Sequence, residues 1–241
     1  MCTIIDMALS EKVVIPKISA TSIYNKLGYK TQQIRNVHGE LIGHEFLLSL
    51  DKLTHLEIEY FFKRLIIDTY STKVMVRTIY ENIKNLKFIN DYIFINMERS
   101  HLCDNHLISE IIKLNFILKK HKSNLVVEIT ERDHCGSCVR IIEGIKYLSA
   151  SGIMLAIDDY DIYKDDLSNF LFSKDVKDLF DIVKINIPEQ YLLPTFNKFI
   201  SKCDKRIIVE MVETREQLEQ VENRNDIWGI QGYIYDKGVK L

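Results

Sequence analysis

Residues that break regular structure are scarce, since the 241-residue chain contains only three prolines and nine glycines. No stretch rich in glycine, serine or proline divides the chain, and neither a low-complexity run nor an internal repeat is evident. Linkers between domains are usually recognised by such compositions. We therefore expect a single domain, whose length suits one barrel of about 250 residues.

Long apolar runs are missing too. No segment approaches the roughly 20 apolar residues that a membrane-spanning helix requires. The first residues carry Asp6, Glu11 and Lys12 within a short apolar stretch, without the cationic start and unbroken apolar core of a signal peptide. The sequence therefore predicts a cytoplasmic protein that does not bind membranes.

A disulfide framework and an excess of charge of one sign are likewise absent. The five cysteines are scattered and odd in number, which suits free thiols in a reducing compartment. Cys135 and Cys138 form one C-x-x-C pair, which could be redox-active or half of a zinc site. No second C-x-x-C or H-x-x-H supplies the remaining zinc ligands, so an ordinary reduced segment is the favoured interpretation. The formal net charge is -2, so no basic field attracts nucleic acid, and we expect no direct nucleic-acid binding.

The sequence does contain an alternation of two patterns. Seven short apolar runs have the length and composition of buried parallel strands: Leu41–Phe46, Tyr92–Asn96, Leu125–Ile129, Met154–Ile157, Ile182–Ile185, Ile207–Val209 and Trp228–Ile230. Longer stretches of helical period lie between them: Leu56–Tyr70, Val74–Leu86, Leu107–Lys120, Val139–Ser151, Leu192–Lys202 and Arg215–Glu222.

With Gly28–Arg35 as a weaker first strand, strand and helix alternate about eight times. This alternation predicts an α/β fold, a parallel (β/α)-barrel of the TIM type, over residues 28–241. Residues 1–27 are predicted to form an N-terminal extension packed on the barrel. A doubly wound open sheet is the alternative, although no G-x-G-x-x-G follows the first strand.

Nearly every apolar run ends on a polar residue: Glu45, Asn96, Glu128, Asp158 with Asp159, Lys184, Glu210 and Gln231. The carboxyl ends of barrel strands converge on one face, so these residues are predicted to meet in one pocket. Oxygen-rich clusters suit hard cations such as Mg²⁺ or Mn²⁺, and paired aspartates can serve two ions in phosphoester hydrolysis. A single carboxylate of this kind is more often a cap or a solvated loop residue, but the recurrence at successive strand ends favours a site.

Seven segments, in one order along the chain, carry a family resemblance: Gly43–Leu47, Phe94–Met97, Val127–Glu131, Ile157–Tyr160, Val183–Asn186, Ile208–Thr214 and Gln231–Tyr233. They resemble the G-x-E-A-L, V-N-L, E-I-T-E, D-D-F, I-K-I-D, V-A-E-G-V-E-T and Q-G-Y motifs of the EAL-domain cyclic-di-GMP phosphodiesterases. The resemblance covers roughly residues 28–240 and implies a modified TIM barrel of the EAL type. Members of this family hydrolyse one phosphodiester bond of cyclic-di-GMP to give linear pGpG.

The resemblance also implies roles for individual residues. A first Mg²⁺ or Mn²⁺ would be held by four side chains: Glu45, Asn96, Glu128 and Asp158. Asp159 would join Asp158 at a second ion, and no organic cofactor is implied. Lys184 would orient the attacking water or the phosphate, Glu210 would assist as base or water ligand, Gln231 would hold the water and metal network, and Glu131 would brace its loop.

Several positions depart from the family pattern, and most of them concern the substrate. Ser49 stands where the family has an arginine that can grip a phosphate in a bidentate contact. The segment Asp158–Asp165 reads D-D-Y-D-I-Y-K-D where the family reads D-D-F-G-T-G-Y-S, so both glycines are lost together with their backbone freedom. Smaller departures follow the same trend: Thr31 or Gln32 in place of Q-P, Asn186, Met211 and Val239.

The metal-binding half of the site is thus predicted to be complete, and the substrate-binding half to be altered. This pattern favours a divergent EAL-like regulator of motility, biofilm formation or virulence that binds a protein partner with little or no catalysis, and for which cyclic-di-GMP binding is weak or absent. A flagellar master transcription regulator is one such partner, and a homodimer is a further expectation. The alternative is an active metal-dependent phosphodiesterase that produces pGpG. A receptor that binds cyclic-di-GMP without cutting it is disfavoured, because the losses fall on substrate contacts.

Overall fold

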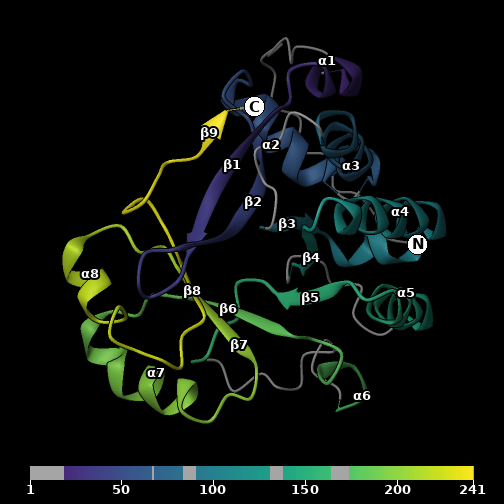
Figure 1. Cartoon of the computed structure of the whole chain (residues 1–241). Coiled ribbons are helices and arrows are strands. Elements are labelled where there is room, and N and C mark those ends of the chain that lie inside the picture. The colour runs from purple at the N-terminus through teal and green to yellow at the C-terminus, as the bar shows by residue number, and fades with distance from the viewer. Residues whose placement is uncertain (1–18, 67, 84–90, 131–137, 164–173, 241) are drawn as a thin grey trace, which may run out of the picture.

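The strands form a closed barrel at the centre of the molecule, with helices around it (Figure 1). The computed structural model describes residues 19–66, 68–83, 91–130, 138–163 and 174–240. The barrel contains eight strands: β1 (Gly28–Arg35), β2 (Leu41–Ser49), β3 (Tyr92–Met97), β4 (Asn124–Ile129), β5 (Met154–Ile157), β6 (Ile182–Asn186), β7 (Arg206–Glu210) and β8 (Gly229–Gln231). A short β9 (Val239–Lys240) pairs with β1 beside β8. The predicted α/β barrel of the EAL type is confirmed, and each predicted strand is present.

The first strand differs from the predicted parallel pattern, because β1 runs antiparallel to both β2 and β8. Only five residues, 36–40, connect β1 to β2, which is too short for the crossover helix that parallel strands need. Asn36 builds this turn by accepting hydrogen bonds from the backbone N–H groups of His38 and Glu40, both at 2.9 Å. Gly39 adopts φ +79°, a conformation that glycine allows at little cost.

Seven α-helices lie on the outside of the strands in the described part of the chain: α2 (His55–Tyr60), α3 (Tyr70–Asn82), α4 (Asn105–Lys120), α5 (Val139–Ala150), α6 (Lys174–Lys177), α7 (Leu193–Ile200) and α8 (Arg215–Glu219). Short helical turns precede or extend several of them: η1 (Phe61–Leu65), η2 (Arg99–Cys103) and η4 (Gln190–Leu192). The predicted single helix over Leu56–Tyr70 is wrong, because α2 continues into the π-helical turn η1 and a separate helix starts at Tyr70. Asp68 starts that helix by accepting a 3.0 Å hydrogen bond from the backbone N–H of Tyr70.

Apolar residues fill the barrel on both faces of its strands. The interior is closed by a compact cluster of fully buried side chains: Ile34, Phe94, Val126, Ala156, Ile182 and Ile208. The outward faces of the same strands pack against the helices in a larger cluster that includes Ile95, Val127 and Val209. Successive side chains of a strand point to opposite faces, so the parallel strands are largely apolar below their carboxyl ends and the helices cover their outer face.

The chain enters the barrel through α1 (Ala20–Tyr24), whose Ile23 is fully buried against Leu53 and Phe61. Residues 1–18 of the predicted extension lie outside the described residues, so the boundary at residue 27 stays a prediction. None of the helices within the described ranges is long and apolar enough to cross a bilayer.

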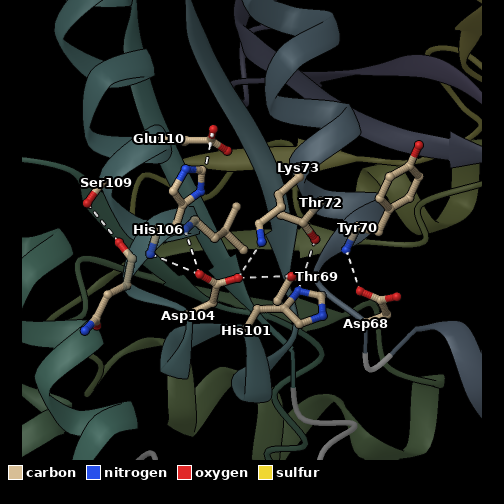
Figure 2. Close-up of polar contacts among 12 residues, drawn as sticks. Asp68, Thr69, Tyr70, Thr72, Lys73, His101, Asp104, His106, Ser109 and Glu110 are labelled. Atoms are coloured by element: carbon tan, nitrogen blue, oxygen red, sulfur yellow. Dashed lines mark hydrogen bonds and ion pairs between the residues drawn. The ribbon is translucent and has the colours of Figure 1, made fainter.

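Asp104 joins α3 to α4 (Figure 2). As the N-cap of α4 it accepts hydrogen bonds from the backbone N–H groups of His106 and Leu107, at 3.0 and 3.1 Å. Its other oxygen accepts from Lys73 Nζ at 2.6 Å and from Thr69 Oγ1 at 3.1 Å. Partial burial acts to raise the pKa of Asp104, but the contacts from Lys73 and Leu107 lower it to about 2. One carboxylate therefore caps one helix and anchors its neighbour.

Replacing Asp104 tests this junction. Asp104→Ala removes the helix cap and the contacts to α3, so the free energy of unfolding should fall by about 2 kcal/mol in urea titrations. Asp104→Asn is the matched control, since asparagine caps a helix as well as aspartate but carries no charge. We expect Asp104→Asn to lose clearly less, and equal losses in the two variants would show that the cap contributes nothing.

Candidate active site

The predicted site residues follow the interior apolar residues by two positions. Asn96 follows Phe94, Glu128 follows Val126, and the same step relates four further pairs: Ala156 to Asp158, Ile182 to Lys184, Ile208 to Glu210 and Gly229 to Gln231. A two-residue step keeps a side chain on the same face of a strand. Each polar residue therefore points into the barrel, one layer above the apolar cluster and at the carboxyl ends of the parallel strands.

Glycine at position 43 brings Glu45 into this layer. A Cβ atom there would lie 2.2 Å from the backbone oxygen of Tyr92, so any larger residue would push β2 away from β3. The family signature residue Glu45 then faces inward, only 4% exposed.

The ammonium group of Lys184 lies at the centre of the cluster. Four carboxylates surround it, with Nζ–oxygen distances of 2.7 Å to Glu210, 2.9 Å to Glu128, 3.2 Å to Asp158 and 3.5 Å to Glu45. Lys184 is 1% exposed and Glu128 is fully buried. One positive charge therefore faces up to four negative charges where little water can screen them.

Burial and neighbouring charges shift the pKa values of these groups in different directions. Burial, together with the neighbouring carboxylates Glu45, Asp158 and Glu210, raises the pKa of Glu128 well above its usual range. Burial likewise raises the pKa of Glu210 to about 8, with Lys184 opposing the shift. Burial also opposes the charges on Glu45 and Lys184. Lys184 and the hydrogen bond from Gln231 nevertheless lower the pKa of Glu45, and the surrounding carboxylates, with Glu128 the strongest, raise the pKa of Lys184. Glu128 and Glu210 are thus the carboxyl groups that retain a proton most readily.

Amide side chains fix the position of Glu45. Asn96 donates from Nδ2 to one carboxylate oxygen of Glu45, and Gln231 donates from Nε2 to the other. Gln231 Nε2 also donates to Gln32 Oε1 at 3.1 Å, and Gln32 in turn donates to the backbone oxygen of Asp236 at 3.2 Å. Glu45 is therefore held directly by amides of β3 and β8, and Gln32 of β1 links Gln231 to the chain beyond β8.

The oxygen atoms of this layer fit a hard cation. Asn96 Oδ1, Glu128 Oε2 and Gln231 Oε1 are buried acceptors that receive no hydrogen bond. Buried polar atoms without partners are costly, and carboxylate and amide oxygens are the ligands that Mg²⁺ and Mn²⁺ prefer. Among the described residues, however, no three acidic, histidine or cysteine side chains form a ready metal-binding group, because the acids turn toward Lys184. The predicted metal cage thus stays a prediction.

The cluster opens into a cavity of about 280 Å³. Met211 and Tyr233 lie at the rim of the cavity, where Met211 is 58% exposed and Tyr233 is 51% exposed. Met211 and Asp159 adopt left-handed backbone conformations, with φ of +57° and +51°, which cost energy in residues other than glycine. Gly232 lies against Val212, where a Cβ atom would come within 2.0 Å of the Val212 oxygen. The rim is thus built from strained and tightly packed backbone.

The structure brings most of the predicted site residues together. Seven line the cavity: Glu45, Asn96, Asp158, Asp159, Lys184, Glu210 and Gln231. Glu128 lies below them in contact with Lys184, and Glu131 falls outside the described residues, as does Cys135. Ser49 is buried beside Gly28 and is not part of the cavity lining.

Several residues that line the cavity were not predicted as site residues from the sequence, or were noted only as differences from the family pattern. Gln32, which was left undecided against Thr31, lines the cavity, and so do Glu213 and Tyr233. Gln32 precedes the interior residue Ile34 instead of following it, because β1 runs in the opposite direction. The same two-residue step, applied in reverse, could have identified it.

The comparisons with known proteins agree with this geometry. The family model for the EAL domain matches residues 26–237, which is most of the chain. The chain is an EAL domain. Over 158 residues, 61% of this chain, it is 29% identical to the probable cyclic di-GMP phosphodiesterase PdeG of Escherichia coli (strain K12). The aligned part spans 30% of the length of that relative.

Solved structures show the same fold at lower sequence identity. The EAL domain protein of Listeria monocytogenes EGD-e superimposes with a TM-score of 0.65 at 18% identity, covering 92% of this chain and 94% of that one. The FimX EAL domain of Pseudomonas aeruginosa, solved bound to c-di-GMP, gives a TM-score of 0.65 at 17% identity, with 90% and 92% coverage. These likenesses support the EAL barrel as the fold of this domain.

The raised pKa of Glu210 predicts how the stability of the domain depends on pH. Between pH 4.5 and 8 the folded state keeps a proton on Glu210 that the unfolded chain has already released. The free energy of unfolding should therefore fall as the pH rises through this window. Urea titrations of the metal-free domain at pH 5.5 and pH 8, in the presence of a chelator, measure this fall. Glu210→Gln, which cannot titrate, should reduce this dependence without abolishing it, since Glu128 also has a raised pKa, and an unchanged slope in that variant would refute the assignment.

The strained backbone of Met211 predicts a stabilising substitution. Met211→Gly should raise the free energy of unfolding by about 1 kcal/mol, because glycine tolerates the left-handed conformation. Lys122 is a matched control, since it also has a positive φ, of +62°, but lies in the turn after α4, away from the cavity. Lys122→Gly should gain a similar amount. A loss of stability in Met211→Gly alone would show that the methionine side chain packs favourably at the rim.

Proposed function

We propose that this EAL domain acts in cyclic-di-GMP signalling as a regulator of motility, biofilm formation or virulence. It works mainly by binding a protein partner, such as a transcription regulator of flagellar genes, and hydrolyses little or no cyclic-di-GMP. The proposal rests on a contrast between two parts of the site. The acids around Lys184 match the family pattern, whereas the rim of the cavity departs from it, as at Met211. A catalytic centre needs both halves, since the acids can act only on a phosphodiester that the rim positions.

The rim supports the proposal in three ways. Its cavity of about 280 Å³ is small, since pockets for drug-sized ligands range from about 300 to 1,000 Å³ and a cyclic dinucleotide is a large ligand. Met211 stands where the family has glycine and is exposed at the mouth. Tyr160, which follows the paired aspartates, donates its backbone N–H to the Lys184 oxygen at 3.0 Å, and its ring packs on Phe199 with centroids 5.5 Å apart. The start of the segment that lacks the family glycines is thus anchored against the barrel at Tyr160.

The second candidate is an active phosphodiesterase, and the convergence of the acids favours it. Glu45, Asn96, Glu128, Asp158 and Asp159 would hold Mg²⁺ or Mn²⁺, which when bound lowers the pKa of a water molecule and neutralises charge on the phosphate. Glu210, with a pKa of about 8, can hold or accept a proton near neutral pH, as a general base requires. Lys184, 2.7 Å from Glu210, would offer its positive charge to the phosphate.

Hydrolysis itself separates the two candidates. The purified domain is incubated with cyclic-di-GMP and either Mg²⁺ or Mn²⁺, and pGpG is measured by chromatography. We expect no more product than from Glu45→Gln, which keeps the size of the side chain but removes its charge. Turnover that disappears in Glu45→Gln would overturn the proposal and establish the phosphodiesterase.

Swimming assays test the contact with a partner. If the domain acts by binding a protein, overproduced wild type and Glu45→Gln should alter swimming of a motile bacterium to the same extent, because neither needs catalysis. If the domain acts by hydrolysis, only the wild type should have an effect. A binding measurement with a purified flagellar master regulator completes the test, and lack of binding would exclude that partner.

A further inference from the structure

A long apolar groove of about 1100 Å³ runs between α3 and α4 on the outside of the barrel. Three large side chains on its walls are well exposed: Tyr70 by 48%, Tyr80 by 54% and Phe116 by 61%. The outward face of a surface helix is normally polar, and a concave apolar surface marks contact with another segment. No lining residue of the groove also lines the acidic cavity, so the groove is a separate feature of the domain.

The two walls repeat with helical spacing. Val74, Arg77 and Glu81 on α3 follow one another at three- and four-residue steps, as do Lys113 and Ile117 on α4. Each set forms one stripe along its helix. Figure 2 shows one end of the groove, with Tyr70 on α3 and Glu110 on α4. Two such stripes, side by side, form a seat for a third amphipathic segment.

We propose that residues 1–18 of this same chain occupy the groove. The described chain starts at Ser19, next to α1, and α1 contacts the groove at the Tyr70 end. The ring of Tyr24 in α1 lies 4.4 Å from the ring of Tyr70, and its hydroxyl donates to Asp68 Oδ2 at 3.3 Å. The described chain therefore begins at a short helix that contacts this end of the groove.

The length of the segment is sufficient. Eighteen residues span about 27 Å as a helix and up to about 60 Å when extended. The 13 residues of α3 measure about 20 Å, so the segment can cover the groove from one end to the other.

The sequence of the segment suits an apolar seat. Ile5, Leu9 and Val13 are four residues apart, which places them on one stripe of a helix. Asp6 lies beside that stripe, next to Val13, whereas Glu11 lies on the opposite face of the helix. Lys12 and Lys17 balance the two acids, so the segment carries no net charge and its fit rests on the apolar stripe with Asp6 beside it.

The rim of the groove on α4 supplies the opposite charge. Lys113 takes part in no ion pair with any residue that the structure describes. Lys120 Nζ lies 4.4 Å from the ring centroid of Phe116, so its charge is held at the edge of the groove. These lysines are suitable partners for Asp6, the carboxylate beside the apolar stripe. The groove therefore offers both the apolar surface and the charge that residues 1–18 can use.

Hydrogen exchange of the full chain, followed by mass spectrometry, tests the proposal. Backbone amides of residues 4–15 should exchange at least about tenfold more slowly than in an unstructured peptide. Phe116→Asp places a charge in the groove and should remove that protection. Tyr147→Asp is the matched control, because Tyr147 is an aromatic residue of α5 with 63% exposure outside the groove. It should leave residues 4–15 protected.

A reciprocal variant excludes an indirect effect. Leu9→Asp should free residues 4–15 to the same extent as Phe116→Asp, and the double variant should be no worse than either single one. Protection of the barrel strands confirms that each variant folds. Residues 4–15 that exchange freely in the wild type, or that stay protected in Phe116→Asp, would overturn the proposal. Sedimentation velocity tests whether a second copy of the chain occupies the groove instead. The groove would be assigned to a second copy if the wild type is a dimer, Phe116→Asp dissociates it, and residues 4–15 stay protected in that variant.

Discussion

The architecture of the site depends on a single buried charge, the ammonium group of Lys184. It contacts four carboxylates that are themselves removed from water, so each acid gains part of its stabilisation from the same cation. One cation cannot balance all of them, and two acids respond by favouring their protonated forms. A divalent cation would compete with Lys184 for these oxygens and would correct the imbalance. Proton uptake and the stability of the barrel are therefore linked at this one point, and binding of a metal ion there would be linked to both.

The positions of the site residues could be predicted because the barrel strands obey a simple rule. An apolar residue inside the barrel, followed two positions later by a polar one, is readable directly from the sequence at Phe94–Asn96, Val126–Glu128 and Ile182–Lys184. Parallel strands place all of these polar residues at the same end of the barrel. The fold and the membership of the cluster therefore follow from local patterns that need no knowledge of long-range contacts.

Other features depend on contacts that no local pattern contains. The direction of β1 is set by its pairing with β2 and β8. Because β1 is antiparallel, Gln32 precedes the interior residue Ile34, and a search for polar residues that follow interior ones does not find it. Lys184 lies at the centre of the cluster because the side chains of four acids on other strands point toward it. The sequence predicted that Lys184 lies beside the metal ions, but it did not predict that the acids surround its charge. The positive φ of Met211 is imposed by the chain around Gly232 and Val212, and nothing in the residue type of a methionine indicates it.

The residues at the rim distinguish a catalytic domain from a silent one better than the acids of the cluster do. Removing any one acid of the cluster leaves Lys184 or a neighbouring amide with a poorer partner in a buried setting, which costs stability whether or not the domain is an enzyme. A complete set of acids is thus expected of an active domain and of a silent one. Met211 and Tyr233 are exposed at the mouth and contribute little to the core, so their identity is set by what enters the cavity. The rim therefore discriminates between the two functions, and it is on the rim that this domain departs from its family.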